Sequence, residues 1–130
     1  MSSIFARIVN GEIPAHKIAE DAHFLAFLDV MPLVEGHTLV IPKREVDYIF
    51  NIDDEMYSAL WMFAKKVSKA VEKAIPCKRI GVAVIGLEVP HAHIHLVPLN
   101  KVGDINFTQS KLNPTSHELA AVAERIRKSF

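Results

Sequence analysis

Apolar and polar positions along the chain alternate in short runs that predict strands. Five such runs are bounded by turn residues, and we expect strands over 16–21, 23–30, 36–43, 79–86 and 91–99. A tight turn near Asp21 joins the first two, and an irregular connection over 87–90 separates the last two, which we expect to lie side by side. These short connections favour antiparallel pairing.

Helical spacing occurs in three other stretches. The longest helix is predicted between Asp53, which can cap it, and Pro76, because apolar residues recur there at three- and four-residue steps. Ser3 can cap a short helix over residues 3–9, and Thr115 with Glu118 forms a capping box for a closing helix. The predicted fold is therefore α+β, with about five mostly antiparallel strands in a sheet and helices packed on it.

Composition fits one soluble domain over residues 1–130, because half of the 130 residues are apolar and no repeat or long linker interrupts them. Lys plus Arg (15) equal Asp plus Glu (15), so the charge balance favours neither a nucleic acid nor a membrane as partner. Cys77 is the only cysteine, which excludes an internal disulfide and predicts a cytoplasmic setting. Any anionic ligand must be bound by local groups.

The stretch "HAHIHLVPL" carries the most specific chemical signal. Side chains alternate across a strand, so His91, His93 and His95 share one face, about 6 to 7 Å apart from one to the next. The residues between them, Ala92, Ile94 and Leu96, share the other face and are expected in the core. The imidazoles are then expected to face outward.

Two chemistries suit three imidazoles on one face. The first is a metal site, to which His37 or Glu88 could add a ligand, because neutral imidazole is a common zinc ligand. The second is nucleophilic and acid–base work on a phosphate, because imidazole is largely neutral at pH 7 and is nucleophilic without a strong base. A third interpretation is that the histidines have no shared role.

"HAHIHLV" fits the His-φ-His-φ-His-φ-φ signature of the histidine-triad (HIT) superfamily, where φ is apolar. "SIFARIVNGEIPAHKIAED" and "FLAFLDVMPLVEGHTLVIPKR" resemble further segments of that family in the same order. The resemblance extends from about residue 3 to 99 and is greatest to the branch called histidine-triad nucleotide-binding proteins.

The resemblance implies a small α+β protein, commonly a homodimer, that binds purine nucleotides and cleaves a bond at the α-phosphorus without a cofactor. By position, His93 is the expected nucleophile and forms a nucleotidyl-histidine that water then cleaves. His91 and His95 flank it, and His37 matches an additional histidine near the triad. The substrate would be a nucleotide conjugate of the phosphoramidate or dinucleoside polyphosphate type.

The nucleotide pocket is also implied by matching positions. Asp29 falls where the family binds ribose hydroxyls, with Leu28 and Val30 beside it. The residues that match the base pocket are Ile4, Phe5, Ile8 and Phe27. From spacing alone, the first three would simply be core residues of a helix, and Asp29 would end a strand.

The chain departs from the family at two places. Bacterial relatives carry Cys-x-x-Cys near the start, and Ser3 and Ala6 stand there instead, so we expect no metal. Leu87 and Glu88 replace an amide and a hydroxyl that contact phosphate in the family, so we expect weaker phosphate binding or a redirected specificity.

Glu88 has three interpretations: a carboxylate facing solvent, a group that raises the pKa of a nearby triad histidine, or a ligand for a cation that brings in the phosphate. We therefore keep two alternatives to a hydrolase or transferase. One is a nucleotide-binding module with little or no turnover, and the other is a metal-dependent protein.

Overall fold

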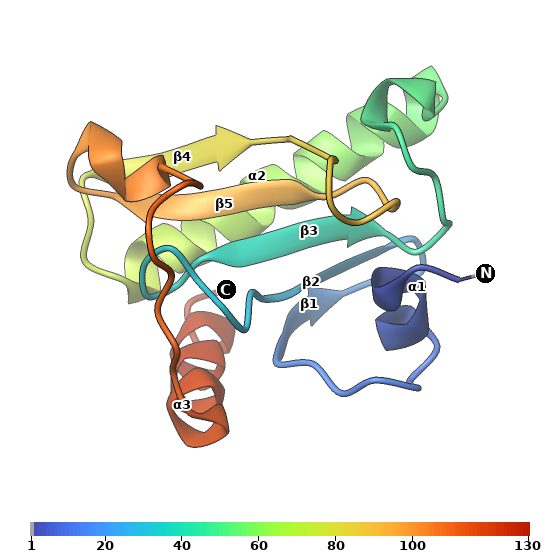
Figure 1. Ribbon diagram of the computed structural model, residues 1–130. Coiled ribbons are helices and arrows are strands. Elements are labelled where there is room, and N and C mark those ends of the chain that lie inside the picture. Colours follow the sequence, from blue (N-terminus) through green and yellow to red (C-terminus); the bar gives the residue numbers. More distant parts are fainter. Residues whose placement is uncertain (1) are drawn as a thin grey trace.

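A computed structural model describes residues 2–130 as a five-stranded sheet with helices on both faces (Figure 1). The strands are β1 (Lys17–Glu20), β2 (Phe24–Leu28), β3 (Thr38–Pro42), β4 (Arg79–Ala83) and β5 (Ile94–Leu99). Their order is β1-β2-β3-β5-β4, and each neighbouring pair is antiparallel. The α-helices are α1 (Ile4–Val9), α2 (Asp54–Ala74) and α3 (Ser116–Arg127), and the short 3-10 turns are η1 (Ile49–Asn51) and η2 (Val102–Ile105). The predicted α+β fold is confirmed.

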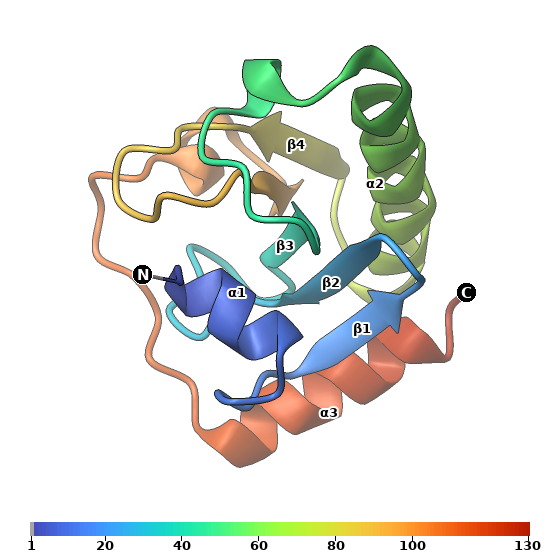
Figure 2. The ribbon, with the colours of Figure 1, turned by 90° about the vertical axis from the view of Figure 1, so that its right-hand side faces the viewer.

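The sheet separates two apolar clusters. In Figure 2, α2 and α3 lie against the sheet away from α1. Leu60, Val67 and Val71 of α2, together with Ile126 of α3, pack on one face of the sheet and form the larger cluster. On the opposite face α1 packs on β2 and β3; this smaller cluster consists of Phe5, Ile8, Leu25, Phe27, Leu39 and Ile41. Alternate residues of β2 and β3 therefore enter different clusters, as strand geometry requires.

The predicted helix starts are confirmed by their side-chain caps. The Ser3 hydroxyl accepts a hydrogen bond from the Ala6 amide at 2.9 Å, and the Asp53 carboxylate accepts one from the Met56 amide at 3.0 Å. At the start of α3, Thr115 and Glu118 form the reciprocal capping box. Each cap satisfies an amide that the helix itself leaves without an acceptor.

The last two strands are shorter than predicted. β4 ends at Ala83 and β5 begins at Ile94, so His91 and His93 precede the strand. Their segment cannot extend the sheet, because the His91 amide donates to Val89 O at 2.8 Å and the next amide donates to Val46 O at 2.7 Å. The polar loop expected over 100–113 also contains η2.

Within residues 2–130, no helix combines the length and the apolar character that a membrane crossing requires.

Candidate active site

A cavity of about 480 Å³ opens beside the triad. Its walls come from α1, the end of β2, the connection over 85–89, and the chain after η2. Ten residues matched from the resemblance line it: Ile4, Phe5, Ile8, Phe27, Leu28, Asp29, Val30, Glu88, His93 and His95. His91 and His37 do not line this cavity. His37 lines a neighbouring cavity of about 300 Å³ on the other side of Asp29.

The histidines do not face outward as expected. His91, His93 and His95 are only 0%, 7% and 8% exposed, because α1 and the connection before β5 cover their face of the sheet. The residues between them lie in the larger core cluster, as predicted. The ring centroids of His93 and His95 are 4.8 Å apart, closer than strand spacing predicts, because His93 lies before the strand begins.

His91 is held by hydrogen bonds at both ring nitrogens. Its Nε2 lies 2.8 Å from Pro42 O, which can only accept, so Nε2 carries the proton. Its Nδ1, 2.8 Å from the Ser3 hydroxyl, then accepts from that hydroxyl. The Ser3 amide also donates to the Glu45 carboxylate. Ser3 thus links the first turn of α1 to the triad.

The carbonyl oxygen of His91 orients the next histidine. His93 Nδ1 lies 2.7 Å from His91 O, so Nδ1–H is the donor and Nε2 keeps its lone pair. Among residues 2–130, Trp61 Nε1 is the only buried side-chain nitrogen or oxygen without a hydrogen-bond partner. His93 Nε2 has no protein partner either, but it does not belong to the buried atoms. It is therefore accessible from the cavity that His93 lines.

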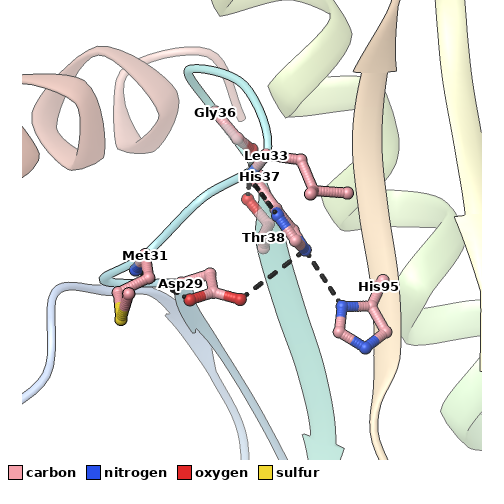
Figure 3. Close-up of polar contacts among 7 residues, drawn as sticks. All are labelled: Asp29, Met31, Leu33, Gly36, His37, Thr38 and His95. Carbon is pink, nitrogen blue, oxygen red and sulfur yellow. Dashed lines mark hydrogen bonds and ion pairs between the residues drawn. The ribbon is translucent and has the colours of Figure 1, made fainter. Parts of the chain in front are cut away.

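His37 and His95 form a relay of fixed direction (Figure 3). The Leu33 amide donates to His37 Nδ1 at 3.0 Å, so the neutral His37 ring carries its proton on Nε2. This Nε2–H donates to His95 Nδ1 at 2.9 Å. The neutral His95 ring therefore presents Nε2–H, a hydrogen-bond donor, toward the cavity.

Burial keeps these rings uncharged. Desolvation, helped by the positive charge of Lys111, lowers the pKa of His37 to about 4, and desolvation with the coulombic effect of His37 lowers the pKa of His95 to about 3. The pKa of His91 is also lowered, mainly by desolvation. Glu88 is not among the groups that shift the pKa of His37, His91 or His95, so its proposed effect on a triad histidine stays a prediction for His93.

Asp29 lies at the end of β2, where its carboxylate borders both cavities. Its Oδ1 accepts a hydrogen bond from the Met31 amide at 2.9 Å, and its Oδ2 lies 3.8 Å from His37 Nε2 (Figure 3). Burial raises the pKa of the Asp29 carboxyl. The turn toward His37 needs a glycine, since Gly36 has φ +91° and a Cβ there would lie 2.7 Å from Ile75 Cγ1.

A metal fits poorly at the two candidate positions, which are the cluster of Asp29, His37 and His95 and the segment that matches the Cys-x-x-Cys of bacterial relatives. Ligand atoms of Asp29, His37 and His95 lie within 4.8 Å of one another. However, the Leu33 amide occupies the Nδ1 lone pair of His37, and its Nε2 carries a proton, so a metal would have to break the relay. Ser3 and Ala6 offer no thiolate, and the Ser3 hydroxyl is already bonded to His91.

The connection before the triad brings no phosphate donor from its side chains. Leu87 is 88% exposed, and the exposed Glu88 lines the cavity with a carboxylate. The chain after η2 brings two residues that the sequence did not identify. Phe107 packs edge-on against His95 with a centroid distance of 4.7 Å, and Lys111 lines the cavity. Neither belongs to a motif or a periodic pattern that could have revealed it.

The fold and the arrangement of the histidines define the class of protein. The model of the HIT domain matches residues 10–102, and the chain belongs to the HIT family. The predicted resemblance is thus confirmed.

Individual relatives are similar over most of their length. The chain is 40% identical over 100 residues to adenosine 5′-monophosphoramidase hnt1 of Schizosaccharomyces pombe, covering 75% of this chain and 74% of that protein. A HIT-like protein of Bartonella henselae has a TM-score of 0.87 and 30% identity, covering 99% of this chain and 96% of that one. A zinc-bound histidine triad family protein of Mycobacterium smegmatis has a TM-score of 0.85 and 27% identity, covering 99% and 93%.

We expect Ser3→Ala to lower the free energy of unfolding by about 1–2 kcal/mol, because it removes both the α1 cap and the hydroxyl bonded to His91. Ser3→Thr keeps both hydrogen bonds and should lose far less. Urea unfolding of the two variants and the parent chain measures the difference. Equal stability of Ser3→Ala and the parent would contradict the role assigned to this hydroxyl.

Stability should fall as the pH is lowered from 7 to 5. His37 and His95 have folded pKa values of about 4 and 3, below the ordinary 6.5, so in this range the unfolded chain binds more protons. Each of the two groups lowers the free energy of unfolding by up to about 1.4 kcal/mol for each pH unit of acidification. This pH dependence ends once the pH falls below the pKa of the group in the folded state. Urea unfolding across this range should show a smaller slope for His37→Gln and an unchanged slope for the exposed His117→Gln. An equal slope in His37→Gln would refute the assignment.

Proposed function

We propose that the chain is a hydrolase or transferase that cleaves purine nucleotide conjugates at the α-phosphorus through a nucleotidyl-histidine on His93. The conjugate is of the phosphoramidate or dinucleoside polyphosphate type. The observation that carries this proposal is the lone pair of His93 Nε2 in the cavity, with Nδ1–H held by His91 O. Similarity to a protein named adenosine 5′-monophosphoramidase supports it.

In the first step, the Nε2 lone pair of His93 forms a bond to the α-phosphorus while the bond to the leaving atom breaks. The leaving atom departs with the bonding electron pair. The ring then carries a positive charge, which the His91 carbonyl dipole stabilises through the 2.7 Å hydrogen bond to Nδ1–H. Covalent catalysis of this kind divides one difficult displacement into two easier ones.

In the second step, water attacks the phosphorus and the nitrogen–phosphorus bond breaks. The bonding pair returns to His93 Nε2, and the product is a nucleoside monophosphate. The proton that the water loses balances the one that the leaving group takes up. Another nucleophile in place of water would make the same step a transfer.

The flanking histidines have different roles in this proposal. His95 donates Nε2–H to a phosphoryl oxygen, and His37 fixes the direction of that donor through its own Nε2–H. His91 acts as a positioning residue through its carbonyl oxygen.

The nucleoside binds in the apolar part of the cavity. Asp29 Oδ2 accepts hydrogen bonds from ribose hydroxyls, while Oδ1 remains bonded to the Met31 amide. The purine packs against the apolar side chains, with Leu28 and Val30 near the ribose; the base-contacting set is Ile4, Phe5, Ile8 and Phe27. A cavity of about 480 Å³ is within the usual range for a ligand of this size.

The second candidate is a nucleotide-binding module with little or no turnover. The exposed Leu87 and the Glu88 carboxylate favour it, because neither can donate a hydrogen bond to phosphate. Equilibrium binding of AMP without turnover of any nucleotide conjugate would select this candidate over the enzyme.

We expect His93→Ala to lower kcat by at least about a thousandfold, because among residues 2–130 no other unprotonated ring nitrogen opens into the cavity. The assay uses adenosine 5′-phosphoramidate and a diadenosine polyphosphate. With substrate labelled at the α-phosphorus, the parent chain quenched in base should carry label on His93. His117→Ala, an exposed histidine outside the cavity, serves as the matched control. Turnover by His93→Ala at the parent rate would exclude the intermediate.

We further propose that residues 1–130 form one HIT-like domain, that the protein is a homodimer and that it is cytoplasmic. The strand order leaves one side of β4 unpaired, and Val82 on it is 50% exposed. An unpaired apolar edge can pair with the same edge of a second copy about a two-fold axis. The single cysteine supports the cytoplasmic location.

The dimer predicts a defined response to a charge at this edge. Sedimentation equilibrium should give twice the chain mass for the parent protein and 14.5 kDa for Val82→Lys. The reason is that pairing of two β4 edges would bury the charge of the new lysine, which opposes the pairing. Val102→Lys, at a position that is 90% exposed on η2, should stay dimeric. A 14.5 kDa species of the parent protein at all concentrations would contradict the proposed dimer.

A further inference from the structure

The cavity beside the triad has an unusual charge balance. Among the residues that the structure describes, Lys111 is the only lysine or arginine that lines it, and two carboxylates, Asp29 and Glu88, line it as well. Lys111 forms no ion pair with any of these groups or with another carboxylate in residues 2–130. Its ammonium group is therefore free to bind an anion that enters the cavity.

His37 and His95 cannot supply positive charge in its place. His37 and His95 have pKa values of about 4 and 3 and are neutral at pH 7. The charge of Lys111 contributes to the lowered pKa of both rings and also lowers that of Asp29, against burial. Its ammonium group is thus within electrostatic reach of all three groups, which lie together in Figure 3.

The backbone around Lys111 is anchored at both ends. Asn106 follows η2, and its side-chain oxygen accepts from the Thr108 amide at 3.0 Å. Phe107 packs on His95, and the Leu112 amide donates to Pro32 O at 2.9 Å. Lys111 therefore lies next to a backbone hydrogen bond that ties its segment to the loop between β2 and β3. This segment follows the part of the chain that matches the HIT domain, which ends at residue 102.

We propose that Lys111 is the phosphate-binding cation of the site and that it selects ligands with an anionic phosphate at the α position. It compensates for the missing donors at Leu87 and Glu88. The inference rests on the proposed nucleotide-binding function and goes beyond it, because it assigns phosphate recognition to the segment after η2. A charge-assisted hydrogen bond from an ammonium group to a phosphoryl oxygen is about twice as strong as a neutral one.

The test compares AMP with adenosine, which has the same base and ribose without the phosphate. We expect Lys111→Met to weaken AMP binding by roughly 10- to 100-fold in calorimetry and to leave adenosine binding within about twofold. Lys111→Arg, which keeps the charge, should bind AMP within a few-fold of the parent chain. Lys101→Met, just before η2 and outside the cavity, is the control and should change neither affinity.

Two results would overturn the inference alone. One is that Lys111→Met binds AMP with the affinity of the parent chain. The other is that Lys111→Met loses affinity for AMP and for adenosine equally, which would mean that the side chain only forms part of the cavity wall. Failure of the parent chain to bind either ligand would overturn the proposed function and this inference together. The experiment therefore separates the two.

Discussion

Three backbone groups with fixed hydrogen-bonding roles determine which ring nitrogens of the site carry protons. The carbonyl oxygens of Pro42 and His91 can only accept, and the Leu33 amide can only donate. The tautomer of an imidazole is set by the hydrogen bonds that its two ring nitrogens make. Here the tautomers follow from the main chain, and the result is one lone pair, on His93, and one donor, on His95, at the same cavity.

The fold determines where those backbone groups lie. Pro42 ends β3 beside the segment that precedes β5, and the turn before β3 brings His37 next to His95. That turn approaches α2 so closely that only a residue without a side chain fits at Gly36. On the other side, α1 closes over the rings, and Phe5 lies edge-on to His93 at 5.0 Å. The same packing that orients the rings removes them from water.

The sequence predicted local structure well, but it did not predict that the histidines are buried. The caps at Ser3 and Asp53, and the alternation that sends Ile94 into the core, depend on neighbouring residues and could be predicted. The burial of the triad depends on α1, which packs there from about ninety residues away, and alternation contains no such information. Lys111 was missed for the same reason, since its position follows from long-range contacts of an irregular segment.

Burial and the phosphate binding that we propose make opposite demands on this site. Desolvation keeps His37 and His95 neutral, with pKa values of about 4 and 3, which preserves the relay that turns His95 Nε2–H toward the cavity. A phosphate needs positive charge, yet protonating His95 at pH 7 would act against a pKa about four units lower and would compete with the relay from His37. In our proposal the positive charge comes from a residue that is not desolvated. Lys111 is exposed at the edge of the cavity, so in this proposal it supplies charge while His37 and His95 remain neutral.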